Sequence, residues 1–488
     1  MKILIAASEA VPYIKTGGLG DVAGVLAVEL ARARHEVALV LPLHKAVDQT
    51  KFPMEIALEC LIVKMGDADL FCRVWKRQIM KKFTVYFIEY AQFFYRHPIY
   101  DDGAKGYYDN GARFAFFSKA CLDLALAVGF KPDVVQANDW QTALIPFYLK
   151  TWDFGSDFFK NTASLLSIHN IGYQGIVPAD IHRFLGLQMW QFRESEFESF
   201  GTINLLKGSI FYADKVVTVS PTYAKEILGE PGGNGLSTYL QRRADDVTGI
   251  LNGIDSKEWN PRTDKLIPAN FTHEDLSGKA LCKEALQKEF GLEVNPHKPI
   301  FGLVGRLAAQ KGLDLLMQCV EEVLQWDLQM VLLGSGDPVL SDFFYHLPTR
   351  FPGKFASHIG FQPHMAHLIE AGSDFFVMPS RYEPCGLNQM YSLHYGTLPI
   401  VRGTGGLVDT VINYQPPLDL GTGFVFYDIS ANALRDTIGW ALATYFNHPE
   451  DIKKMQVRGM LEDFTWGRAI KQYMVAYKEA VNRRKSWT

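Results

Sequence analysis

The stretch KILIAASEAVPYIKTGGLGDVAGVLAVELARARHEVALVLP (2–42) joins an apolar run, a glycine-rich loop, a helical pattern and a second apolar run. The two runs, residues 2–7 and 36–42, lack the alternation of a half-buried strand. Continuous apolar strands separated by a helix are typical of buried parallel strands in a βαβ unit. The stretch therefore predicts an α/β fold with a doubly wound parallel sheet.

The rest of the chain repeats this alternation in two series of short apolar runs. The first series continues at residues 83–89, 133–137, 164–169 and 215–220, and the second lies at 299–306, 328–337, 374–380 and 398–406. A polar, proline-containing segment separates them. We place the domain boundary at about residue 245, before the apolar stretch 247–253. This gives doubly wound domains at 1–245 and 246–465, followed by an amphipathic C-terminal helix at 466–488.

The composition is that of a globular protein, and it argues against nucleic-acid and membrane partners. Of 488 residues, 48% are hydrophobic and 21% are charged. The net charge is 49 − 53 = −4, which argues against a nucleic-acid partner. None of the six cysteines has C-x-x-C spacing, so neither a zinc ribbon nor a redox pair is expected. The short N-terminal apolar run and the absence of a long apolar stretch predict a cytoplasmic protein without membrane contact.

The glycine-rich loop KTGGLGDVAG (15–24) is the first candidate binding element, because ligands of open α/β sheets bind at the carboxyl ends of the strands. Lys15 adds a positive charge, and Gly18 lets the backbone of the following helix approach an anion. Gly18, Gly20 and Ala23 also fit G-x-G-x-x-G/A, which would indicate a nicotinamide-dependent oxidoreductase. The late glycines and the lack of an acidic residue after the second strand count against that alternative. A turn without a binding role stays open.

Two loops of the second domain carry a second group of candidates. In VGRLAAQKG (304–312), Arg306 and Lys311 can clamp a diphosphate and stabilise the charge of a leaving group. In MPSRYEPCGLNQ (378–389), Glu383 precedes Pro384 at the start of a helix that we predict from about Cys385 to Tyr395. A carboxylate there can accept hydrogen bonds from sugar hydroxyls. The alternatives are solvated loop cations and a carboxylate that stabilises the helix start.

Polar residues also follow strands of the first domain and the strand at the boundary. Asp139, His169 and Asn252 lie at or just after strand ends, where their side chains can meet at one edge of a sheet. A structural role for His169 remains the alternative. The D-x-D pair Asp67 and Asp69 has the spacing of a metal site in some sugar transferases, but its context favours a turn. We therefore expect no metal and no cofactor.

Taken together, these motifs resemble the bacterial glycogen synthase and plant starch synthase family, in the family's order along nearly the whole chain. The matching segments are KTGGLGDV (15–22), HNIGYQG (169–175), VSPTYAKEI (219–227), LNGID (251–255), GRLAAQKG (305–312), SRYEPCGLNQMYSLHYGTLPIV (380–401) and GTGGLVDTV (403–411). The resemblance implies the GT-B fold: two Rossmann-like domains facing across a deep cleft, with the C-terminal helix returning to the first. It also implies a retaining glycosyltransferase that transfers glucose from ADP-glucose to the non-reducing end of glycogen or another α-1,4-glucan.

The resemblance assigns roles to the candidates. It implies a catalytic set of Glu383, Arg306, Lys311, His169 and Asp139. It implies an ADP-glucose site of Lys15, Gly18, Asn252, Phe361, Cys385, Gly386 and Leu387, with Phe361 packing on adenine. It places Tyr100 near the acceptor. The family's pattern is broken at Asn138, where a histidine is expected, and Tyr391 stands where many related transferases have a second glutamate.

Three alternatives to this function stay open at the level of sequence. One is another retaining GT-B glycosyltransferase with a different sugar nucleotide or acceptor, and the second is the nicotinamide-dependent oxidoreductase. The third is a non-catalytic glucan-binding protein, against which the charged residues after strands of both domains argue. The sequence does not predict the oligomeric state.

Overall fold

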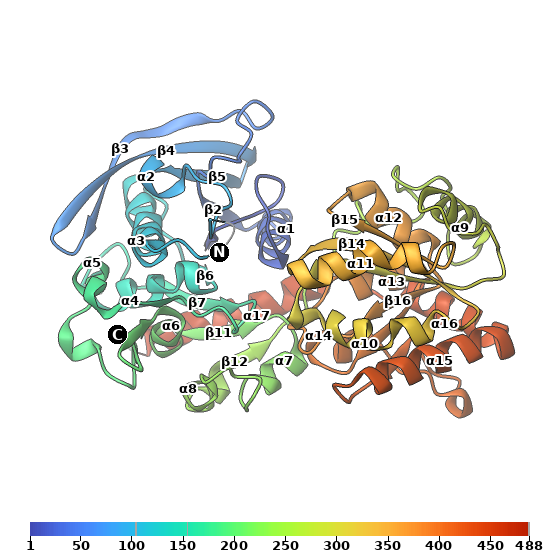
Figure 1. Cartoon of the computed structure of the whole chain (residues 1–488). Helices are drawn as coiled ribbons and strands as arrows, with labels where there is room; N and C mark the ends of the chain where they lie inside the picture. Colours follow the sequence, from blue (N-terminus) through green and yellow to red (C-terminus); the bar gives the residue numbers. More distant parts are fainter. Residues whose placement is uncertain (103–104, 154, 487–488) are drawn as a thin grey trace. The chain divides into compact units, whose positions relative to one another are not determined.

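The computed structural model describes residues 1–102, 105–153 and 155–486, and it divides into two compact units (Figure 1). Unit 1 contains residues 1–250 and the C-terminal residues from 466 on, and unit 2 contains residues 251–465. In the part of the chain that the structure describes, no helix combines the length and the hydropathy that a membrane span requires.

Unit 1 is built on a nine-stranded sheet with the order β12-β11-β7-β6-β1-β2-β5-β4-β3. The strands from β12 to β5 are parallel, as predicted, and β4 pairs antiparallel with both β5 and β3. Their bounds are β1 (Lys2–Ala6), β2 (Glu36–Pro42), β3 (Glu55–Met65), β4 (Ala68–Met80), β5 (Phe83–Glu89), β6 (Val134–Asn138), β7 (Ala163–Ile168), β11 (Lys215–Thr218) and β12 (Val247–Gly249). A small separate sheet contains β8 (Ile176–Val177), β9 (Glu198–Ser199) and β10 (Thr202–Asn204).

Helices cover the sheet of unit 1, and the C-terminal helix is one of them. Helix α17 (Trp466–Lys485) shares a hydrophobic core with α1 (Gly18–Arg32) and with the β1 residues Ile3 and Ile5. It runs along β7 and β11 (Figure 1), and its Glu479 pairs with Lys215 of β11 at 2.7 Å. The predicted return of this helix to the first domain is thus confirmed. The other helices of unit 1 are α2 (Ala91–Phe94), α3 (Asn110–Ala127), α4 (Leu144–Lys150), α5 (His182–Leu185), α6 (Leu205–Tyr212), α7 (Pro221–Glu226) and α8 (Ser237–Gln241).

Unit 2 is a six-stranded parallel sheet with the order β15-β14-β13-β16-β17-β18. Numbered within the unit, this order is 3-2-1-4-5-6, the strand order of the doubly wound nucleotide-binding fold. The switch in direction between β13 and β16 marks the edge where such folds bind ligands. The bounds are β13 (Ile300–Leu307), β14 (Gln329–Gly336), β15 (Phe355–Ile359), β16 (Phe375–Met378), β17 (Leu398–Arg402) and β18 (Phe424–Phe426).

Two hydrophobic cores lie on the sheet of unit 2, each formed with its own set of helices. One core contains residues of α10 (Leu313–Val323), α11 (Pro338–Arg350), α15 (Ala431–Asn447) and α16 (Pro449–Leu461). The other contains residues of α9 (Ser277–Glu289), α12 (Pro363–Gly372) and α14 (Gly405–Thr410). Helix α13 (Asn388–His394) follows β16. The strands alternate between the two cores, so both faces of the sheet are covered.

The boundary between the units differs from the predicted position. We placed it at residue 245, which assigned the stretch 247–253 to the second domain. Strand β12 instead pairs in parallel with β11 and completes the sheet of unit 1. Unit 1 therefore continues to Ile250, and the chain enters unit 2 at Leu251. The short apolar run was recognised as a strand, but its sequence carries no information about which sheet it joins.

Candidate active site

Arg306 and Lys311 lie at the carboxyl edge of the unit 2 sheet, next to the switch point. Arg306 is the exposed penultimate residue of β13, and Lys311 ends the 3-10 helix η5 (Ala309–Lys311) before α10. Gly312 ends this turn with φ 66°, and a Cβ atom there would meet the carbonyl oxygen of Pro379 at 1.9 Å. Only glycine therefore lets the loop after β13 pack so closely on the loop after β16.

Glu383 is the acidic partner of Lys311. Its side chain is buried, its Oε2 lies 2.6 Å from Lys311 Nζ, and Ser380 Oγ donates a hydrogen bond to the same oxygen at 2.9 Å. The sequence identified Lys311 and Glu383 as candidates in two separate loops, and in the structure the two side chains are in contact. Oε1 makes no hydrogen bond within the described part of the chain, so one carboxylate oxygen is left to accept further donors.

The predicted helix after Glu383 begins later than expected. Helix α13 starts at Asn388, whereas the sequence placed its start at about Cys385. Gly386 has φ 74°, a left-handed conformation that a right-handed helix cannot contain. Glu383 therefore lies in a loop rather than in a first helical turn. Gly405, with φ 47°, supports this loop, because a Cβ atom there would meet the Glu383 carbonyl oxygen at 1.9 Å.

The other unit 2 candidates are Asn252, Cys385 and Leu387, which lie in or near the Glu383 loop, and Phe361, which follows β15. Asn252 is buried near Cys385, and burial raises the pKa of the Cys385 thiol to about 12. The Asn252 Oδ1 atom has no hydrogen-bond partner within the described residues. Leu387 directly precedes α13. Phe361 is 71% exposed on the loop between β15 and α12, so its ring is free to pack on a planar ligand.

Tyr391, which replaces the second glutamate of related transferases, belongs to an aromatic stack. Its ring lies parallel to Trp259 at a centroid distance of 4.0 Å, and Trp259 stacks on its other side against His367 at 3.9 Å. The side chain is 8% exposed. Tyr391 therefore contributes packing at this position, where a glutamate would have offered a carboxylate.

In unit 1, Lys15 and Gly18 lie in the glycine-rich loop that follows β1, at the carboxyl edge of the sheet. Lys15 is exposed, its Nζ lies 2.7 Å from Asp21 Oδ2, and Gly18 opens α1 with free space where a side chain would be. Glu9 holds the loop, because its carboxylate accepts hydrogen bonds from the Thr16 hydroxyl at 2.9 Å and from the Gly17 amide at 3.3 Å. The sequence analysis missed Glu9. Its only signal is its position three residues after the end of β1.

Tyr100, the predicted acceptor residue, directs its hydroxyl toward protein groups. The hydroxyl donates to Glu9 Oε1 at 3.1 Å and lies 2.6 Å from Ser8 Oγ. Burial and the neighbouring Glu9 carboxylate raise the pKa of Tyr100 well above its usual range, so the hydroxyl stays protonated. Tyr100 thus helps to fix the glycine loop, and a contact with an acceptor would have to come from its ring.

Asp139 and His169 meet at the carboxyl ends of β6 and β7. Asp139 has φ 53°, and its Oδ1 accepts hydrogen bonds from the backbone amides of His169 at 2.6 Å and Asn170 at 3.3 Å. Burial raises the pKa of Asp139 to about 7, and it lowers the pKa of His169 to about 3. His169 is therefore neutral at physiological pH. Asp139 braces the His169 backbone, and the imidazole ring itself contacts Asn138 at 2.9 Å.

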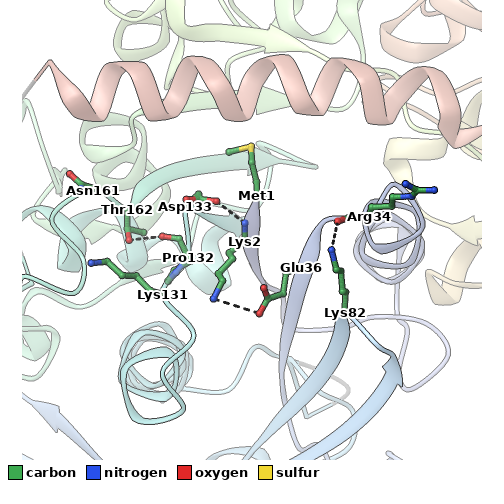
Figure 2. Close-up of a pocket in the computed structure, with 10 residues that line it drawn as sticks. All are labelled: Met1, Lys2, Arg34, Glu36, Lys82, Lys131, Pro132, Asp133, Asn161 and Thr162. Carbon is green, nitrogen blue, oxygen red and sulfur yellow. Dashed lines mark hydrogen bonds and ion pairs between the residues drawn. The ribbon is translucent and has the colours of Figure 1, made fainter.

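A separate cavity of about 550 Å³ lies at the opposite edge of the unit 1 sheet (Figure 2). Its residues precede β1, β2, β5, β6 and β7 or begin them, so they mark the amino ends of the strands. Figure 2 shows Lys2 turned toward Glu36, at 3.7 Å, and Lys82 turned toward the carbonyl oxygen of Arg34, at 3.3 Å. Because parallel sheets bind ligands at their carboxyl ends, this cavity is not the candidate active site.

The D-x-D pair forms the turn that its sequence context favoured. Gly66 and Asp67 are the turn residues of the β3–β4 hairpin, and Asp69 pairs with Lys64 across it. Within residues 1–102, 105–153 and 155–486, no group of three or more His, Cys, Asp or Glu side chains is arranged to hold a metal ion.

Comparisons with known proteins agree with this arrangement. Residues 2–242 match the family described as "Starch synthase catalytic domain", and residues 286–456 match "Glycosyl transferases group 1". The chain is 42% identical to glycogen synthase 1 of Geobacter metallireducens over 486 residues, which are 99% of this chain and 97% of that protein. It is 43% identical to the glycogen synthase of Lactococcus lactis over 483 residues, covering 98% of this chain and all of that one.

Solved structures give the same result for the fold. The catalytic domain of starch synthase IV from Arabidopsis thaliana, bound to ADP and acarbose, matches with a TM-score of 0.90 and 32% identity, covering 99% of both chains. Sucrose-phosphate synthase from Thermosynechococcus elongatus matches with a TM-score of 0.60 over 98% of both chains. At 18% identity the second likeness concerns the fold alone. The predicted GT-B class, with two Rossmann-like units, is confirmed.

Proposed function

The chain belongs to the family of bacterial glycogen synthases and plant starch synthases, and from this premise we propose that it is itself a glycogen synthase. It transfers glucose from ADP-glucose to the non-reducing end of an α-1,4-glucan with retention of configuration. The observation that carries the proposal is the contact of Lys311 with Glu383 beside Arg306, at the ligand-binding edge of unit 2.

The unit 2 residues would hold the nucleotide-sugar donor. Arg306 and Lys311 bind its diphosphate and stabilise the negative charge that grows as the bond to glucose breaks. Glu383 accepts hydrogen bonds from glucose hydroxyls, for which its Oε1 is available. Asn252 lies near the donor sugar or its phosphates, and the backbone of Cys385, Gly386 and Leu387 borders the donor. Phe361 packs on the adenine ring.

The unit 1 residues would contact the sugar and the phosphates. Lys15 offers a charge to the phosphates, and the amides at the start of α1, at Gly18, offer hydrogen bonds to the same anion. His169 accepts a hydrogen bond from the transferred sugar, and Asp139 keeps the His169 backbone in place. Tyr100 lies near the acceptor, which its ring would contact.

We assign no protein nucleophile to the reaction. Glu383 is already engaged by Lys311 and Ser380, which suits the binding of hydroxyls better than an attack on the sugar. The acceptor hydroxyl attacks the same face of the sugar from which the diphosphate leaves, and a phosphate oxygen takes its proton. Because fixed cations serve the leaving group, the proposal requires no metal and no further cofactor. The cytoplasmic location stays a prediction from the sequence.

Donor specificity is the decisive test. The purified chain is incubated with glycogen and radiolabelled ADP-glucose or UDP-glucose, and label in precipitated glycogen is counted. We expect incorporation from ADP-glucose and much less from UDP-glucose. Preferential use of UDP-glucose would identify another retaining glycosyltransferase, and binding of glycogen without incorporation from either donor would indicate a non-catalytic glucan-binding protein.

A further inference from the structure

A chain of buried side chains runs from the C-terminal helix to the imidazole of His169. Tyr477 of α17 donates its hydroxyl to Gln136 Oε1 at 2.6 Å, and Gln136 Nε2 donates to Asn138 Oδ1 at 3.1 Å. His169 Nε2 lies 2.9 Å from the same Asn138 oxygen. Tyr477 and Gln136 are fully buried, and Asn138 is 1% exposed. The catalytic role proposed for His169 makes no use of these three residues.

The direction of every hydrogen bond in this chain is fixed by one backbone carbonyl. Asn138 places its other amide atom 2.9 Å from the carbonyl oxygen of Ala6, which can only accept. That atom is therefore Nδ2, and the atom that faces Gln136 and His169 is Oδ1. An oxygen acceptor requires N–H donors from both neighbours. Gln136 thus presents Nε2, and its Oε1 is left for the Tyr477 hydroxyl.

The same reasoning fixes the proton on His169. Its Nε2 faces Asn138 Oδ1, so this nitrogen carries the hydrogen, and Ser167 Oγ, 3.2 Å away, is a second acceptor for it. Burial keeps the ring neutral, so there is a single ring proton. Nδ1 is then a bare acceptor. It has no hydrogen-bond partner among the described residues, and it is not sealed from solvent.

We infer that Asn138 and Gln136 are positioning residues that hold His169 as its Nε2–H tautomer and present Nδ1 as the acceptor for a hydroxyl of the transferred sugar. The sugar contact rests on the proposed function, whereas the tautomer does not. Tyr477 is the outer link, through which α17 keeps the Gln136 amide from rotating. The asparagine at the position where the family resemblance led us to expect a histidine thus has a defined task.

The surroundings of His169 permit a clear test by charge. Asp139 is the titratable group in contact with it, and its carboxylate bonds to the His169 backbone amide, whereas Gln136, Asn138 and Ser167 are neutral. In Asn138→Asp, one carboxyl oxygen keeps an acceptor at Nε2 and the other faces the Ala6 carbonyl oxygen. When this carboxyl group ionises, it adds a negative charge about 3 Å from the ring. A nearby negative charge favours the imidazolium, so Nδ1 gains a proton at a higher pH.

The tautomer is measured by ¹⁵N NMR of histidine-labelled protein, in which His169→Gln identifies the His169 signals. In the natural chain we expect a protonated Nε2 and an unprotonated Nδ1 from pH 5 to pH 8, with no ring protonation, although the titration of Asp139 near pH 7 can move the shifts slightly. In Asn138→Asp we expect a titration within this range, an upward shift of at least ~2 pH units. The matched control is Asn161→Asp, which adds the same charge at the exposed residue before β7, at the opposite edge of the sheet (Figure 2).

Kinetics connect the tautomer to the reaction. In Asn138→Asp, kcat/KM measured one pH unit below the new pKa of His169 is about tenfold lower than the value of the same variant well above that pKa. The reason is that a protonated Nδ1 can no longer accept a hydrogen bond. A protonated Nδ1 in the natural chain at pH 7 would overturn the inference. The measurement on the natural chain needs no folded Asn138 variant. If the NMR results hold and no glucose is transferred, the proposed function fails while the tautomer assignment stands.

Discussion

Lys311 Nζ and Glu383 Oε2 lie 2.6 Å apart, although 72 positions separate the two residues in the sequence. The Glu383 side chain is 7% exposed and that of Lys311 is 26% exposed. A pair this enclosed differs from surface ion pairs, because removal of one partner leaves the other charge buried without compensation. Without ligand, Lys311 neutralises Glu383, and a bound diphosphate would become the second anion that this lysine contacts.

We predict that Lys311→Met and Glu383→Gln each lower kcat/KM by ~100-fold or more, the scale of losing one charge-stabilising group. The double variant loses less than the product of the two effects, because both substitutions remove the same contact. The rates are measured with ADP-glucose and glycogen in a double-mutant cycle. Lys288→Met and Glu284→Gln remove an exposed pair on α9 and serve as the control. Independent, multiplicative losses would contradict the coupling.

Lys15→Ala tests the cation of unit 1. Glu9 and Tyr100 hold the backbone of the glycine loop, so the substitution removes the charge and leaves the loop in place. The pair with Asp21 joins an exposed lysine to a half-buried carboxylate and adds at most about 1 kcal/mol to stability. We expect a loss of at least ~100-fold in kcat/KM with an unchanged melting temperature. Lys64→Ala, on the exposed side of β3, is the control for loss of a surface lysine. Equal activity of both variants would remove Lys15 from the phosphate site.

The parallel strands could be predicted from the sequence because strands buried on both faces consist of continuous apolar runs. Residues 36–42 and 83–89 are strands in the structure with the predicted bounds. The β3–β4 hairpin was missed, since its strands mix apolar and charged residues and leave Ile62 and Phe71 exposed. A sheet edge with one solvated face lacks the uniform burial that made the other strands recognisable.

The candidate site shows the same limit at the level of single residues. Glycine-rich and charged loops after strands identified Lys15, Arg306 and Glu383, because strand order places such loops at one edge of a sheet. The residues that hold them, Glu9 and Ser380, carry no pattern, since their role depends on where the chain folds back. The start of α13 was missed because one left-handed glycine, Gly386, delays it.

Arg306→Ala is expected to lower kcat/KM by ~100-fold or more without affecting the fold. The guanidinium is exposed, and its contact with Gln310 Oε1, at 3.5 Å, is too long to stabilise the loop. Arg306→Lys restores only part of the rate, since an ammonium cannot bind a phosphate through two parallel hydrogen bonds. Gln310→Ala is the matched control and keeps its activity. A full rate in Arg306→Ala would exclude a role in stabilising the leaving group.

Chelation of divalent metals tests whether fixed cations suffice. We expect that excess EDTA leaves glucose transfer unchanged, because Arg306 and Lys311 supply the positive charge that a metal provides in other transferases. Transfer is measured after dialysis against EDTA and again after addition of magnesium or manganese. Activity that disappears in EDTA and returns with either ion would show that the leaving group depends on a metal.

His44 makes the stability of unit 1 sensitive to acid. Its Nε2 lies 2.9 Å from the carbonyl oxygen of Ser8 in a fully enclosed site, and burial lowers its pKa to about 4 from 6.5. Because the folded pKa is the lower one, the stability contribution of the neutral ring is complete above pH 6.5. It is lost as the pH falls toward 4. A difference of about 2.5 units predicts a loss of about 3 kcal/mol.

His44→Gln removes this dependence while keeping an N–H donor for Ser8. Urea unfolding at pH 7 and pH 4.5 should therefore show a smaller difference in unfolding free energy for the variant than for the natural chain. His182→Gln, at a half-buried position of the same unit, is the control and keeps the full difference. His169, whose pKa burial lowers to about 3, and Asp139, whose pKa burial raises to about 7, contribute the same pH dependence to all three proteins, so the comparison isolates His44. If the difference in unfolding free energy between pH 7 and pH 4.5 is the same in His44→Gln as in the natural chain, the acid sensitivity originates in other residues.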